Sequence, residues 1–178
     1  MEKVTQVLFG VMLSIFFTSS AIAKNKSEAF IENFAANCVY SAPAFEKMES
    51  MAKIANWHPL SKEEAQLLGP VDPGAQFKGW RVQEEKAEDS FFIGYSQGVI
   101  EGNHMKNCAI TSQNGTRADI TRMLTEMNLV GKQLMNDTLG FQTSTVWEAK
   151  LNGGYSGVIF FITYKEQAGG VLVLGIIQ

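Results

Sequence analysis

Apolar side chains recur with a period of two in most segments after residue 75, and this pattern constrains the fold more than any other feature. Such a period is typical of β-strands, whose successive side chains point to opposite faces of a sheet. Short turn signals rich in Gly and Asn separate the segments, so neighbouring strands should be antiparallel. The expected strands are a segment around Trp80 and Val82, Ser90–Ile100, His104–Thr111, Phe141–Trp147, Tyr155–Tyr164 and Val171–Ile177.

The segment Tyr155–Tyr164 differs from the others because it is apolar almost without interruption. A near-continuous apolar run is typical of a central strand that is covered on both faces. Turns on either side are predicted by Asn152-Gly153-Gly154 and by Gly169-Gly170.

Four other segments have the spacing of helices. The first begins near Ser27. The second is expected from Ser41, with Pro43 in its first turn, to the stop at His58-Pro59. The third opens on the capping-box pattern Ser61-x-x-Glu64 and ends at Gly69-Pro70, and the fourth begins at Thr116. Three apolar stripes have helical spacing: Phe30, Ile31, Phe34 and Cys38; Phe45, Met48, Ala52 and Ala55; and Ile120, Met123, Leu124 and Met127.

The resulting order of elements is ααα-βββ-α-βββ. It predicts an α+β fold, a two-layer domain in which the N-terminal helices and one mid-chain helix pack on one face of an antiparallel sheet. No linker rich in Pro, Ser or charge divides residues 24–178, so we expect a single globular domain. The α-βββ unit occurs twice without a repeat at the level of residues. Whether its strands form one sheet or two is left open.

The first 23 residues have the layout of a secretory signal peptide. Lys3 precedes the apolar run Val7–Phe17, and Ala21-Ile22-Ala23 supplies an A-x-A cleavage site. The run is shorter than the roughly 20 apolar residues that cross a bilayer, so we expect cleavage after Ala23 and no membrane span in the mature chain. The sequence therefore predicts a periplasmic or secreted protein.

Cys38 and Cys108 are the two cysteines of the chain, and both lie after the expected cleavage site. In an oxidising compartment an even pair usually forms a disulfide, so we predict a Cys38–Cys108 bond between the helices and the sheet. Two buried free thiols are the alternative. A metal site is a poorer interpretation, because neither cysteine has a nearby His or Cys that would complete four ligands.

Charge and motif content exclude some classes of ligand. The net charge of -3 and the absence of a basic cluster argue against a nucleic-acid partner. The acidic run Glu84–Asp89 lacks the alternating oxygen ligands and the glycine of a calcium loop. His58 and His104 lack metal-ligand spacing, so no metal and no cofactor is predicted.

One motif suggests catalysis. Gly94-Tyr95-Ser96-Gln97-Gly98 matches G-x-S-x-G and resembles the local sequence of cutinases and related α/β-hydrolases, a resemblance that covers five residues and implies a nucleophilic Ser96. The nucleophile elbow of that fold requires a helix directly after the strand, whereas the residues after Gly98 have the pattern of a strand and a hairpin. His104 is the one histidine that follows the serine, and it would lie in the same hairpin. We interpret Ser96 as part of an ordinary strand.

These observations are compatible with three functions, of which the first is preferred. The first is a secreted, non-catalytic binding or accessory protein that contacts a protein partner or a cell-envelope ligand, with an inhibitor or immunity-type role included, through its sheet face or a helix-sheet cleft. The alternatives are a small secreted serine hydrolase that uses Ser96 with His104 or His58, and a carrier of a small apolar ligand. The oligomeric state is not indicated by the sequence.

Overall fold

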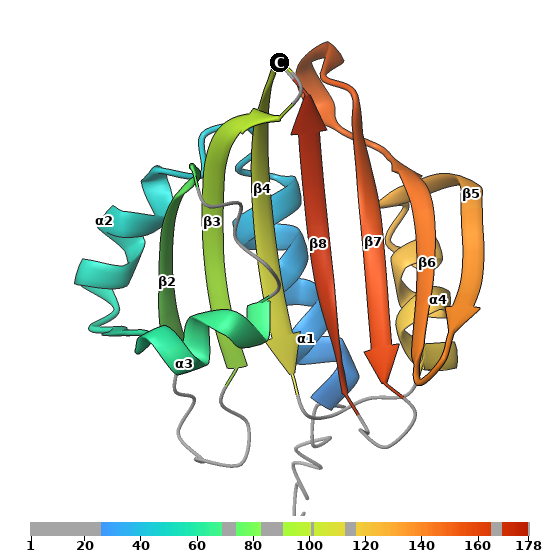
Figure 1. Cartoon of the computed structure of the whole chain (residues 1–178), viewed down its shortest axis with the longest axis horizontal. Coiled ribbons are helices and arrows are strands. Elements are labelled where there is room, and N and C mark those ends of the chain that lie inside the picture. The colour runs from blue at the N-terminus through green and yellow to red at the C-terminus, as the bar shows by residue number, and fades with distance from the viewer. Residues whose placement is uncertain are drawn as a thin grey trace, which may run out of the picture.

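Antiparallel strands build the centre of the molecule in the computed structural model (Figure 1), which describes residues 26–68, 74–82, 91–100, 102–112, 117–164 and 169–177. Within these residues eight strands form one sheet, in the order β1-β2-β3-β4-β8-β7-β6-β5. The two sets of strands join where β4 pairs with β8, so the sheet is continuous. The strands are β1 (His58–Pro59), β2 (Gln76–Val82), β3 (Phe91–Ile100), β4 (Asn103–Ser112), β5 (Val130–Leu139), β6 (Gln142–Ala149), β7 (Gly157–Tyr164) and β8 (Gly170–Ile177).

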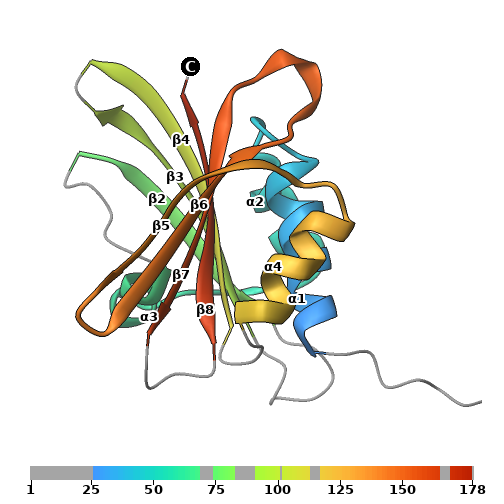
Figure 2. The same ribbon diagram turned by 90° about the vertical axis from the view of Figure 1, so that its right-hand side faces the viewer.

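Helices lie on both sides of this sheet. Figure 2 shows three of them on one side: α1 (Lys26–Phe34), α2 (Lys47–Ile54) and α4 (Arg117–Glu126). The short helix α3 (Lys62–Ala65) lies on the other side. Helical turns of other types extend two of these helices or join two strands: η1 (Ala35–Val39), η2 (Gln66–Leu68) and η4 (Asn152–Gly154).

The main hydrophobic core lies between the sheet and the three helices α1, α2 and α4. The predicted stripe of α1 is confirmed, because its four residues are all buried there. In α4, Ile120, Met123 and Leu124 are buried as predicted. From the sheet, one face of every long central strand contributes to the same core: Ile93 and Tyr95 of β3, Cys108 and Ile110 of β4, Ile159 and Phe161 of β7, and Leu172, Leu174 and Ile176 of β8.

The predicted element order ααα-βββ-α-βββ is wrong in both halves, and one helix lies on the other side of the sheet from where it was expected. The chain is mixed α+β as predicted. Four strands follow α4, one more than expected, since the sequence does not predict β5. His58–Pro59 forms a two-residue strand and not only a helix stop. The sequence of β5 lacks the two-residue period because the strand is exposed on both faces after Gly131 and contains register shifts against β6. The third helix was expected beside the others, yet α3 lies across the sheet from them.

The second helix begins later than its sequence indicates. Hydrogen-bonded turns occupy Ser41–Ala44, and α2 starts at Lys47, since the residue before Pro43 is disfavoured in helical conformation. Phe45, Met48 and Ala52 are buried as predicted. Ala55 is exposed, because it follows the last residue of the helix.

Several predictions fall on residues outside those that the structure describes. They are the signal peptide 1–23 with its cleavage site, the helix stop Gly69-Pro70, the acidic run 84–89 and the helix start at Thr116. Among the described residues, no helix is long and apolar enough to cross a membrane.

Candidate functional site

The face of the sheet opposite α1, α2 and α4, called the open face below, carries many apolar side chains although these helices do not cover it. Strand register assigns its residues, because side chains alternate between the two faces and each residue lies beside its partner on the next strand. The three strands β4, β8 and β7 present no charged side chain to the open face within the described residues. Their open-face residues are Asn103, Met105, Asn107, Ala109 and Thr111; Val171, Val173, Gly175 and Ile177; and Val158, Phe160, Ile162 and Tyr164.

One end of the open face is covered by the chain itself. Leu60 and Leu68, which flank α3, pack in a small second cluster with Ala109, Val171 and Val173. Phe77 of β2 and Phe92 of β3 belong to the same cluster. Leu60, which precedes α3, and Leu68 of the turn η2 thus bury part of this face.

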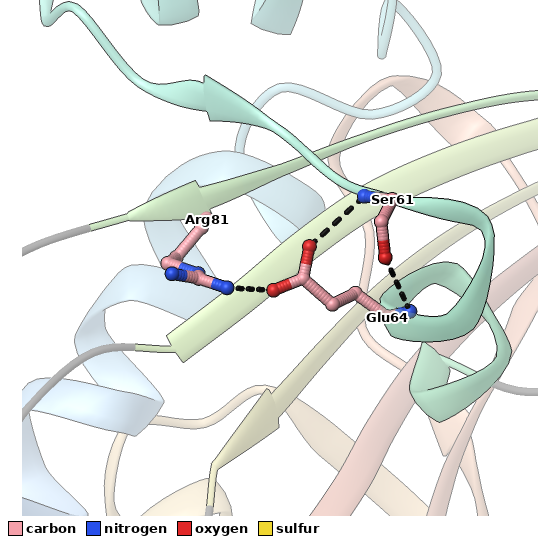
Figure 3. A network of polar contacts seen from close by, with 3 residues as sticks. All are labelled: Ser61, Glu64 and Arg81. Atoms are coloured by element: carbon pink, nitrogen blue, oxygen red, sulfur yellow. Dashed lines mark hydrogen bonds and ion pairs between the residues drawn. The ribbon is translucent and has the colours of Figure 1, made fainter.

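A polar network holds α3 at this end (Figure 3). The hydroxyl of Ser61 accepts a hydrogen bond from the backbone N–H of Glu64 (3.2 Å), and the Glu64 carboxylate accepts one from the backbone N–H of Ser61 (2.9 Å), which confirms the predicted capping box. The other carboxylate oxygen of Glu64 forms an ion pair with Arg81 of β2. The guanidinium of Arg81 also lies over the ring of Phe92, 5.6 Å from its centroid.

Beyond this cover, apolar side chains continue across the open face over β5, β6 and β7. We call Met135, Val146, Val158, Phe160 and Ile162 the open-face patch. They are neighbours by register, because Val146 pairs with both Met135 and Phe160. Val146 is buried among the others, Val158, Phe160 and Ile162 are half-buried, and Met135 is 44% exposed. The prediction that β7 is covered on both faces is therefore wrong for the face that carries Phe160.

Ser96 lies on the open face in the middle of β3, between Phe77 of β2 and Asn107 of β4. The side-chain amide of Asn107 donates a hydrogen bond to its hydroxyl (3.4 Å). Gly94 is required by packing: a Cβ there would lie 2.8 Å from the carbonyl oxygen of Lys78 and 3.0 Å from Leu68. The G-x-S-x-G pattern thus lies within a strand rather than at a strand-to-helix turn.

The two histidines are not placed beside this serine. His104 pairs with Val99 and is exposed; it lies three residues from Asn107 on the same strand, so it points to the opposite face from Ser96. His58 pairs with Arg81 at the edge of the sheet. Arg81 in turn pairs with Phe92, which lies four positions from Ser96 on β3, about 13 Å along the strand.

Cys38 and Cys108 lie at disulfide distance, with 1.99 Å between the sulfur atoms. Cys38 belongs to the turn η1 that continues α1, and Cys108 is in β4 on the helix-covered face. Both are fully buried. As predicted, the cysteine pair connects the helical layer to the sheet.

A polar cluster on the helix-covered face was not predicted. The Tyr95 hydroxyl donates to Oε1 of Glu49 (2.5 Å), and Nζ of Lys78 lies 2.7 Å from the same oxygen. Hydrogen bonds from Lys78 and then Tyr95 lower the pKa of Glu49, while burial and the hydrogen bond to Glu49 raise the pKa of Tyr95. The three residues come from α2, β2 and β3, so no spacing in the sequence could indicate them. Their arrangement fastens α2 to the sheet.

No group of three or more His, Cys, Asp or Glu side chains that could hold a metal ion is present in the part of the chain that the structure describes. Comparison with models of protein families, with curated proteins and with solved structures found no match. The open-face patch is therefore the candidate site on its geometry alone.

Proposed function

We propose that this chain is an exported, non-catalytic binding protein that receives a helical segment of a partner protein on its open face. The observation that carries the proposal is the composition of β7: Ile159 and Phe161 point into the core, whereas Val158, Phe160 and Ile162 are equally apolar and point to the open face. Contiguous apolar surface that reaches water is typical of interaction sites; within the open-face patch Met135 is 44% exposed and the three β7 side chains are half-buried.

The three central strands of this face, β4, β8 and β7, present no described charge to it, which favours a partner that contributes an apolar surface. A charged ligand would find no opposite charge on the open-face residues of β4, β8 and β7 that the structure describes. The half-buried aromatic ring of Phe160, with Val146 buried beside it, is of the type that anchors protein interfaces.

A helix is the favoured form of partner segment, because the chain already covers the other end of this face with a segment that contains the short helix α3 and the turn η2. Leu60 and Leu68 pack on it through leucine side chains next to a short helix. An amphipathic helix with an apolar stripe would bury Phe160 and its neighbours in the same way. Two sequence features support export: the leader pattern of residues 1–23, and a cysteine pair that an oxidising compartment would join.

Photo-crosslinking in the cells from which the protein comes tests the proposal. A photoreactive phenylalanine analogue is introduced at Phe160, where an aromatic ring is already present, and at Ile54, which is 82% exposed on α2, as the matched control. We expect a discrete adduct with another protein at position 160 and none at position 54. The additional change Val173→Asp should abolish the adduct, since Val173 pairs with Phe160.

Equal labelling at both positions, or no adduct at either, contradicts the proposal. An adduct with a second copy of the chain, or a bound apolar small molecule detected by mass spectrometry of the intact protein, would replace the partner protein with a dimer or a carrier function. Loss of an esterase activity of the purified protein on Ser96→Ala, with the fold unchanged, would instead favour the hydrolase.

A further inference from the structure

The two ends of the sheet differ in how well they are protected against pairing with another strand. At one end, β1 has two residues, and one of them is Pro59, which has no backbone N–H to donate. At the other end, β5 has ten residues, and no strand of the described chain pairs with its outer edge. Long exposed edges are sites of strand addition.

The exposed part of β5 is apolar enough to support such pairing. Every residue from Lys132 to Leu139 is exposed. Leu134 is 49% exposed, Met135 44% and Leu139 84%. Three large apolar side chains on one exposed edge strand are costly to leave in water, so a pairing strand would bury surface as well as satisfy backbone groups.

The sequence of β5 is complementary to itself when two copies are antiparallel. About a centre between Leu134 and Met135, Lys132 of one copy lies opposite Asp137 of the other. Gln133 then lies opposite Asn136, and Leu134 opposite Met135. Each pair occurs twice across the symmetry axis, so this register makes two ion pairs of opposite charge. A register centred on Asp137 would place two carboxylates against each other instead.

The irregularity of β5 places Gln133 and Asn136 as this register requires. Residues opposite each other in a sheet must point to the same face, and in a regular strand residues three apart do not. Gln133 pairs with Trp147 and Asn136 pairs with Thr145, so both lie on the helix-covered face, because the register shifts between Gln133 and Met135. The bulge therefore brings Gln133 and Asn136 onto the same face, as their pairing between copies requires.

We propose that a second copy of this chain pairs antiparallel along β5, with Lys132 of each copy beside Asp137 of the other. The two sheets then form one continuous sheet, and both open faces lie on the same side of the dimer. The interface uses the edge of β5 and leaves Phe160 uncovered, and it shares only Met135 with the partner site proposed above.

Sedimentation velocity of the purified full chain tests the proposal through charge reversal. The unmodified protein should dimerise. Lys132→Glu places Glu against Asp137, and Asp137→Lys places Lys against Lys132, so each variant alone should dimerise about tenfold more weakly. An equimolar mixture of the two variants should regain the original affinity, because the heterodimer has two pairs of opposite charge. The double variant Lys132→Glu/Asp137→Lys should regain it as well.

Lys62→Glu is the matched control, with the same change of charge on an exposed residue of α3. It should leave dimerisation unchanged, and circular dichroism should show the same fold for all variants. A monomer throughout the concentration series overturns the proposal. So does a dimer that is insensitive to both reversals. If both variants weaken the dimer but their mixture does not recover, the register is wrong.

Discussion

Phe160 and Phe161 are neighbours on β7 with the same side chain and opposite environments. They are therefore a matched pair for comparing how much the open face and the core contribute to the free energy of unfolding. Phe161 is 1% exposed beneath the helices, whereas Phe160 is half-buried on the open face. Truncation of a fully buried Phe to Ala costs about 3–5 kcal/mol, from lost transfer free energy and the cavity left behind. Phe160 keeps contact with water and leaves no closed cavity, so Phe160→Ala should cost only about 1–2 kcal/mol.

Urea denaturation of Phe160→Ala and Phe161→Ala, followed by fluorescence and circular dichroism, gives both free energies of unfolding. We expect Phe161→Ala to lose at least twice as much stability as Phe160→Ala. Loss of partner binding should show the reverse order, because only Phe160 belongs to the open-face patch. Equal losses of stability would mean that something covers both faces of β7 in the isolated protein, and the binding proposal would lose its basis.

Three further predictions test interactions that stabilise the fold. Cys38→Ala/Cys108→Ala should lower the free energy of unfolding by about 4 kcal/mol, because the cysteines are 70 residues apart in sequence; urea denaturation measures it, and no loss would mean that the bond does not form. Since pairing with Lys78 lowers the pKa of Glu49 in the folded state, its contribution is complete at neutral pH and is lost as the pH falls below its ordinary value of 4.5. The stability difference between the native chain and Glu49→Gln should therefore shrink in acid, and a difference that grows would contradict the assignment. Ser61→Ala should cost about 1 kcal/mol by thermal denaturation, through loss of the helix cap, and an unchanged midpoint would contradict that role.

The elements that could be predicted from the sequence are those in which local pattern and tertiary environment agree. In α1, one face is buried along the whole helix, so Phe30, Ile31 and Phe34 recur with helical spacing. The capping box of α3 is a contact between residues three apart, and the hairpin of β3 and β4 has Gly102 in a positive-φ conformation at its turn. In each case the residues that interact are close together in the sequence.

The elements that could not be predicted depend on contacts that no short window contains. Strand β5 has an apolar residue at its start and is exposed from Lys132 onward, so no period of two distinguishes it from a loop. The cluster of Glu49, Lys78 and Tyr95 joins three elements. The apolar run in β7 correctly indicated a strand, but the sequence could not show that only one of its faces is covered by helices.

The arrangement of the sheet explains why the open-face patch lies where it does. The sheet has two halves, β1–β4 from the first part of the chain and β5–β8 from the second. Their last strands, β4 and β8, pair at the centre, and outward from them β3 and β2 correspond to β7 and β6. The helices that precede the two halves, α1 and α4, contact each other on the covered side (Figure 2). In the first half, the segment with Leu60 and Leu68 crosses to the open face and packs on β2, β3 and β4. In the second half, only residues 127–129 join α4 to β5. This connection is too short to cross to the open face, so it leaves the corresponding surface on β6 and β7 uncovered. A partner helix on Phe160 would therefore cover the open face of the second half, as α3 and its flanking leucines cover the open face of the first.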